Sequence, residues 1–239
     1  MNDTLQLVLL GALSGLVSGV TGFGSGLILM GTLVAVMPVQ QATVIAAVLA
    51  VVLAAVNLHS VRRDIPWREV WPTLAAGVPA VVLGVRLLTV LDETILRAGV
   101  ALIILVGVAS VLWTRGGWRI RRRAWGLVAG AASGVFNGAL GTGGPPLVIY
   151  ALLRGWDKEC CKAFYSILFL LMGLFRMVLL VTQGVATDAA LGQGLLIVVP
   201  VVGAWYVGAW IFRRSSNQAF RYAGAALLAA TAVNLLVDL

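Results

Sequence analysis

Long apolar runs recur along the whole chain, and no other feature limits its possible folds as strongly. They follow one another from Leu5 to Leu236 with short polar connections between them, too many for a single membrane anchor. Because 61% of the residues are hydrophobic and only 11% are charged, against about 45–50% and about 25% in soluble domains, an ordinary soluble fold is excluded. Disorder is excluded too, since it requires low hydrophobicity. A helix needs about 20 apolar residues to cross a bilayer, so the sequence predicts an all-α polytopic membrane protein.

Positive charges gather in a few of the connections. The net charge is +8, and most of the 17 Lys and Arg residues fall in 62–68, 115–123, 154–162 and 213–221. Basic residues in alternate loops are the topology signal of helical membrane proteins. Once these loops are accounted for, no basic face is left for nucleic acid. We therefore expect the lipid bilayer, and no nucleic acid, as a partner.

The chain contains two copies of one unit. Residues 11–24 (GALSGLVSGVTGFG) align without a gap with 130–143 (GAASGVFNGALGTG), at an offset of 119 and with seven identities. Further along, Gly84 and Arg97 fall opposite Gly208 and Arg221 at an offset of 124. Internal repeats of this kind are common in secondary transporters. The sequence predicts two transmembrane repeats, 1–118 and 119–239.

Each copy divides into five apolar segments. They are 5–20, 26–37, 41–59, 70–88 and 95–113 in the first copy, and 124–140, 145–153, 163–182, 190–212 and 219–237 in the second. At about 1.5 Å per residue, 26–37 and 145–153 would be only about 18 Å and about 14 Å long, too short for a hydrocarbon core of about 30 Å. We expect each copy to be a Gly-broken half-helix hairpin followed by three full spans.

The basic connections also predict the orientation of the copies. If the first two segments of a copy form a re-entrant hairpin or two crossings, each copy crosses an odd number of times and the second copy is inverted. Most of the basic residues then share one side, whereas a single broken crossing would divide them between both sides. The positive-inside rule favours inverted-topology repeats with both termini outside. Whether the first two segments are re-entrant or fully spanning stays open.

Glycine runs mark the predicted breaks. Pro145 and Pro146 directly follow the second run, and proline suits the first turn of a helix. Two short helices would thus start inside the membrane with unpaired N–H groups and positive dipole ends. Inversion would bring these starts together as an anion site built from backbone. Upstream glycines at every fourth position are interpreted as helix-packing seams instead: Gly11, Gly15, Gly19, Gly130, Gly134 and Gly138.

Polar residues near the breaks complete the predicted site. Arg176 is interpreted as the one charge well inside a span, and its counterpart at the offset of 119 is Asn57. The alternative is that Arg176 snorkels to the membrane surface. At Gly24 and Gly143 we expect positive φ angles, which glycine permits. The predicted substrate-binding residues are Thr21, Gly22, Gly24, Ser25, Gly26, Asn57, Asn137, Gly141, Thr142, Gly143, Gly144 and Arg176.

Acidic residues fall in loops or at the ends of segments, which disfavours a cation site and fits an anionic substrate. The motifs SGVTGFGSGL and NGALGTGGPPL, the basic central loop and a length near 240 residues resemble the TauE/SafE (TSUP) family of sulfite exporters. The resemblance implies transport of sulfite, thiosulfate or organosulfonates across the bacterial cytoplasmic (inner) membrane.

We therefore predict a secondary transporter of a small anion that works by alternating access. An anion channel is the first alternative. A membrane-embedded enzyme is the second, and it is disfavoured because the spans carry no Ser-His, Cys-His or metal-ligating cluster. No catalytic residue, metal or cofactor is predicted, and a homodimer is left open.

Overall fold

The computed structural model describes residues 3–34, 37–92, 94–95, 120, 122–220 and 222–223. These residues form ten helical elements and no strand: α1 (Asp3–Thr21), α2 (Ser25–Leu33), α3 (Val39–Val61), the 3-10 turn η1 (Arg62–Asp64), α4 (Trp67–Val90), α6 (Trp125–Leu140), α7 (Gly144–Arg154), α8 (Lys158–Thr182), α9 (Asp188–Leu196) and α10 (Val198–Arg214). The predicted segments 95–113 and 219–237 lie almost wholly outside the described residues.

Three of the described helices are long and apolar enough to cross a membrane. They are α3 with η1 (Val39–Asp64), α4 and α8. The helix α1 presents a stripe of half-exposed leucines, Leu5, Leu9 and Leu13, whose spacing of four residues places them on one helix face. An exposed apolar stripe of this kind suits contact with lipid. The chain is therefore an all-α, multi-pass membrane protein.

The predicted segment 190–212 is not one continuous helix, because the chain bends there by 42° between α9 and α10, as in a broken span or a re-entrant loop. Pro200 lies in the first turn of α10. It has no N–H to offer the carbonyl of Leu196, and its ring would clash with that carbonyl in a continuous helix. Gly192 and Gly194 further weaken the turn before the bend.

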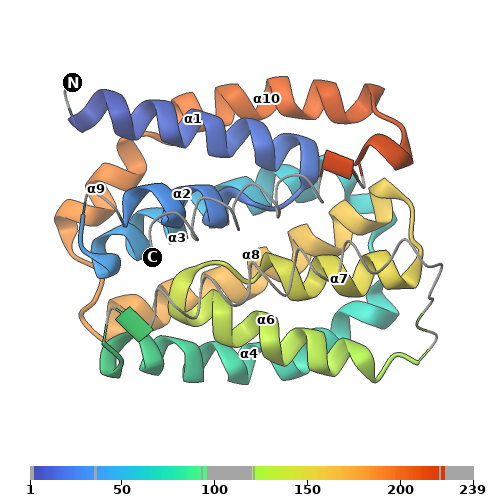
Figure 1. The fold of residues 1–239 in the computed structure, drawn as a ribbon, viewed down its shortest axis with the longest axis horizontal. Helices are drawn as coiled ribbons and strands as arrows, with labels where there is room; N and C mark the ends of the chain where they lie inside the picture. Colours follow the sequence, from blue (N-terminus) through green and yellow to red (C-terminus); the bar gives the residue numbers. More distant parts are fainter. Residues whose placement is uncertain are drawn as a thin grey trace.

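The helices are arranged as two outer pairs with a central group between them. In Figure 1, α1 and α10 lie side by side along one edge, and α4 and α6 lie along the opposite edge. Helices α2, α3, α7 and α8 fill the space between the pairs. From the start to the end of each helix, α1 and α10 run from left to right in Figure 1, whereas α4 and α6 run from right to left.

Glycines allow the helices of each outer pair to touch backbone to backbone. Gly19 of α1 faces the carbonyl of Trp205 and the Cα of Gly208, and Gly138 of α6 faces the carbonyl of Val81 and the Cα of Gly84. The prediction that the upstream glycines form packing seams is confirmed. The two seams also use corresponding positions, since Gly19 and Gly138 differ by 119 while Gly84 and Gly208 differ by 124.

Candidate functional site

A small cavity lies where α2 and α7 begin. Its volume is about 30 Å³, and its wall is formed by the ends of α1 and α6, the starts of α2 and α7, and one side each of α3 and α8. Nine of the twelve predicted site residues line it: Gly22, Gly24, Ser25, Gly26, Asn57, Asn137, Gly141, Thr142 and Gly144. Thr21, Gly143 and Arg176 do not line it. The structure thus brings most of the predicted residues of both copies to one place.

The first break follows α1. The chain turns through Gly22 and Gly24, whose φ angles are 79° and 91°, in the left-handed region that favours glycine. The Thr21 hydroxyl donates to the Phe23 carbonyl at 2.7 Å and accepts from the Phe23 N–H at 3.3 Å. Thr21 therefore fixes the shape of the turn from behind the cavity wall. As predicted, a short helix, α2, begins at Ser25.

The second break follows α6 and has a similar shape. Gly141 has a φ of 68°, and α7 begins at Gly144 with its two prolines in the first turn. The expectation of a positive φ at Gly143 is wrong, because its φ is −67°. Gly143 is turned toward α6 instead, where the Ser133 hydroxyl donates to its carbonyl at 2.7 Å. A Cβ added at Gly143 would lie 2.9 Å from the Cβ of Asn137, so this glycine supports the wall without facing the cavity.

The two breaks meet at the cavity. Gly26 in the first turn of α2 faces the carbonyl of Gly141 so closely that no side chain would fit between them. A Cβ added at Gly144 would lie 3.2 Å from the Phe23 ring. The starts of α2 and α7 are therefore held against each other, and each belongs to a different half of the chain.

Hydrogen-bond donors at the cavity are left without partners. Neither α2 nor α7 has a side-chain cap on its first turn, so the N–H groups at the start of α2 stay available. The Asn137 Nδ2 and the Thr142 Oγ1 have no hydrogen-bond partner among the described residues, although both side chains are buried. Buried donors are almost always paired, so unpaired donors around one cavity indicate a place for a ligand that accepts hydrogen bonds.

Asn57 lines the cavity from α3 and is tied to two other helices. Its Nδ2 donates to the Ser18 hydroxyl at 3.0 Å, and its Oδ1 accepts from the Trp205 indole N–H at 2.8 Å. These bonds join α3 to the last turn of α1 and to the middle of α10. Asn57 therefore couples the cavity wall to the α1–α10 pair.

Arg176 lies on α8, directly behind the second break. It is 1% exposed, and its Nε donates to the Gly138 carbonyl at 3.3 Å. The alternative that Arg176 snorkels to the membrane surface is therefore wrong. Its Nη2 has no hydrogen-bond partner among the described residues.

Lys162 was missed by the sequence analysis, which placed it in a basic loop. It belongs to α8, is fully buried, and donates from Nζ to the Gly19 carbonyl at 2.6 Å. The Nζ also lies 4.2 Å from the centre of the Phe212 ring, a cation–π contact. Arg176 is thus not the one charge inside a span. The sequence did contain a signal that α8 begins before Lys162. Asp157 is the N-cap of α8 and accepts from the Cys160 N–H at 2.8 Å.

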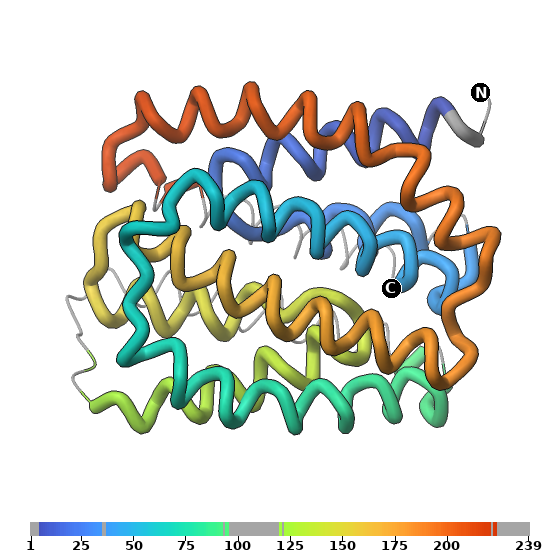
Figure 2. The backbone as a smooth tube through the Cα atoms, turned by 180° about the vertical axis from the view of Figure 1, so that it is seen from behind, coloured from blue at the N-terminus to red at the C-terminus, as the bar shows by residue number. Residues whose placement is uncertain are grey.

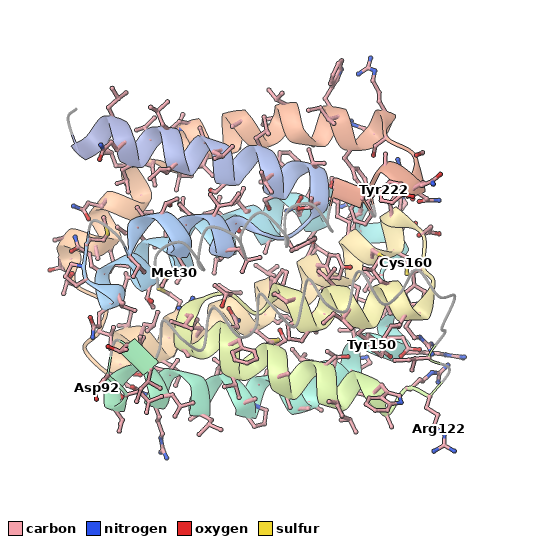
Figure 3. All side chains as sticks on the ribbon, viewed as in Figure 1. Met30, Asp92, Arg122, Tyr150, Cys160 and Tyr222 are labelled. Carbon is pink, nitrogen blue, oxygen red and sulfur yellow. The ribbon has the colours of Figure 1, made fainter. Side chains whose placement is uncertain are left out.

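A separate ionic cluster, the Glu69 cluster, joins α4 and α7 away from the cavity. The Glu69 carboxylate is buried at the start of α4, accepts from the Tyr150 hydroxyl at 2.7 Å, and pairs with Arg123 at 3.2 Å and with Arg154. Figure 3 shows Tyr150 toward the same end of the molecule as Arg122, with Asp92 at the opposite end. The cluster therefore lies toward the end that carries the basic connection before α6.

Comparison with known proteins identifies a family that matches most of the chain. Residues 7–235 match the model of the family described as sulfite exporter TauE/SafE. A curated protein of Cupriavidus necator, named "Probable sulfite/organosulfonate exporter TauE", is 31% identical over 214 residues, which cover 84% of this chain and 83% of that protein. No solved structure matches the chain.

Proposed function

Because the chain belongs to the TauE/SafE family of sulfite exporters, we propose that it moves a small sulfur-containing anion across the bacterial inner membrane as a secondary transporter. Sulfite, thiosulfate and organosulfonates are the candidate substrates. The name of the Cupriavidus necator relative supports the sulfite and organosulfonate part of this set. The family's description as exporters supports transport over catalysis.

One observation carries the proposal: the cavity at the starts of α2 and α7 offers donors and no negative charge. The uncapped N–H groups of α2 and the unpartnered Asn137 Nδ2 and Thr142 Oγ1 converge on it. None of the described residues in its wall is Asp or Glu. Helix starts of this kind bind oxyanions through backbone N–H groups and the positive dipole end.

The size of the cavity supports alternating access over a continuous channel. At about 30 Å³ it has room for about two water molecules, less than a sulfonate needs. An anion could therefore enter only after the walls move, and movement of one repeat against the other around a fixed site is the basis of alternating access.

The proposed binding test uses purified protein and a set of anions. We expect sulfite, thiosulfate or an organosulfonate such as sulfoacetate to raise the melting temperature in a saturable way, because a ligand that binds only the folded state stabilises it. Taurine and sulfate complete the set, and flux into proteoliposomes tests movement of the anion that binds. Saturable flux is expected. Conductance that rises in proportion to anion concentration would identify the channel alternative, and no stabilisation by any of these anions would contradict the proposed site.

We further propose that the two copies, 1–118 and 119–239, are inverted repeats with both termini outside. The opposite directions of the two outer pairs in Figure 1 support this arrangement. The corresponding glycines of the two seams support it as well, because they relate α1 to α6 and α4 to α10. The positive-inside rule then places the Arg122 end of the molecule in the cytoplasm.

Cysteine labelling tests this orientation. After replacement of Cys160 and Cys161 by serine, a cysteine at the exposed Gln183, near Thr187, is expected to react with a membrane-impermeant maleimide in intact cells. A cysteine at the exposed Arg122 is expected to react only after the cells are permeabilised. Labelling of position 122 from outside would overturn the proposed orientation.

A further inference from the structure

Two buried cations on α8 hold equivalent carbonyl groups at the ends of two other helices. Lys162 donates to the carbonyl of Gly19 in the last turn of α1, and Arg176 donates to the carbonyl of Gly138 in the last turn of α6. Gly19 and Gly138 correspond at the offset of 119. The two accepting carbonyls are therefore equivalent, one in each half of the chain, although both cations belong to the second half.

Each cation also lies directly behind the cavity wall. A Cβ added at Gly22 would lie 2.8 Å from the Lys162 Cγ, and one added at Gly141 would lie 2.7 Å from the Arg176 Nη1. Gly22 and Gly141 both line the cavity, and both have positive φ angles. The left-handed glycines thus bring the backbone of each break against one cation.

The two cations break the symmetry of the repeats. Both come from α8, which lies beside α3 across the middle of the molecule in Figure 2. Their own counterparts on α3, at the offset of 119, are the neutral residues Thr43 and Asn57. No described carboxylate forms an ion pair with Lys162 or Arg176. Their charges therefore stay uncompensated by any described acidic side chain.

The position of these charges matters because each break contains two helix ends of opposite polarity. The starts of α2 and α7 are positive and attract an anion, but α1 and α6 end at the same breaks and present the negative ends of their dipoles. A cation bound to the last carbonyls of a helix neutralises that negative end. With both neutralised, the positive helix starts dominate the field in the cavity.

We propose that Lys162 and Arg176 are the positioning residues of the anion site, each neutralising the C-terminal end of one broken helix. This inference rests on the proposed function, because it assumes that the cavity binds an anion. It predicts that the positive charge of each side chain, rather than its packing alone, sets the affinity. Lys162 is thereby a determinant of anion binding although it does not line the cavity.

The test compares Lys162→Met with a matched lysine one turn earlier on the same helix. Lys158 holds the carbonyls of Phe212 and Ser215 at the end of α10 and does not belong to the cavity wall. Affinities of folded, monodisperse protein for thiosulfate, a dianion, and methanesulfonate, a monoanion, are measured by calorimetry. Lys162→Met is expected to bind methanesulfonate about tenfold more weakly, the upper range for a charge at a helix end, and to lose more for thiosulfate. Lys162→Arg and Lys158→Met are expected to match the wild type.

Arg176→Gln tests the same statement at the other break and decides the question if Lys162→Met does not fold. It is expected to lose about tenfold. Because the cations are 14 residues apart on one helix, or about 21 Å, the double variant is expected to lose about a hundredfold by additivity. Equal losses for the monoanion and the dianion, or a loss in Lys158→Met as large as in Lys162→Met, would overturn the inference. If the wild type binds neither anion, the proposed binding site itself fails.

Discussion

Gly24→Val is expected to lower the affinity for the transported anion about a hundredfold or more, because displacement of a positioned binding group by about 1 Å can have an effect of that size. Gly24 is the N-cap of α2, lines the cavity and has a φ of 91°. A β-branched side chain resists that conformation, so the turn must change shape and move the N–H groups of Ser25 and Gly26. Binding is measured on folded, monodisperse protein by the anion-induced rise in melting temperature and by calorimetry.

Two other glycines serve as controls for Gly24→Val. Gly184 also has a positive φ, of 70°, but a Cβ there would have no heavy atom within 4 Å. Gly184→Val therefore carries the same backbone strain, about 1–2 kcal/mol, and is expected to bind the anion normally. Gly134→Val is expected to lower the yield instead, because its Cβ would lie 2.7 Å from the Cβ of Ala80 in the helix seam. Normal binding by Gly24→Val would show that the start of α2 is not part of the site.

Glu69→Ala is expected to cause the largest loss of stability among substitutions outside the cavity. Its carboxylate is buried and binds the Tyr150 hydroxyl and Arg154 at the joint between α4 and α7. Removing one partner of a buried ion pair costs about 3–5 kcal/mol, and in a protein of this length 1 kcal/mol shifts the melting temperature by about 2–4 °C. The expected loss is therefore about 6–20 °C, measured by thermal unfolding in detergent.

Arg123→Ala is the control for Glu69→Ala. Its side chain is 55% exposed although it pairs with the same carboxylate, and exposed ion pairs contribute about 0–1 kcal/mol. We expect its melting temperature to stay within about 4 °C of the wild type. Similar small losses in both variants would contradict a structural role for the Glu69 cluster.

The helix breaks and glycine seams could be predicted from the sequence because their causes are local. Gly22, Gly24 and Gly141 end or redirect a helix through their own backbone conformation, and Pro145 and Pro146 suit the first turn of the next helix. Glycines at every fourth position leave one helix face without side chains, so close backbone contact follows from the spacing alone. The short helices α2 and α7 accordingly begin within one residue of the predicted starts.

The buried charges could not be predicted, because their partners are distant in the sequence. Lys162 is stabilised by the carbonyl of Gly19, 143 residues away. Glu69 is stabilised by Tyr150 and Arg154, 81 and 85 residues away. Hydropathy counts any charge as a mark of a loop, so the start of α8 was predicted at residue 163 instead of Lys158. The bend before α10 was missed because a proline does not always break a helix. Helix α4 contains Pro72 and Pro79 without a break, so proline alone does not predict a bend.

Each glycine seam pairs a helix of one half of the chain with a helix of the other half, and this bears on how such a chain could have originated. Gly15 and Gly19 are covered by α10, and Gly134 and Gly138 are covered by α4, so neither half covers its own glycine face. Under the inverted arrangement proposed above, an ancestral gene encoding a single half would have needed two subunits inserted in opposite directions, each covering the other. Dual insertion of one sequence requires a weak charge bias between its loops. Fusion of two such genes removes that requirement, and each half can then accumulate its own basic connections, as 62–68 and 154–162 do in this chain.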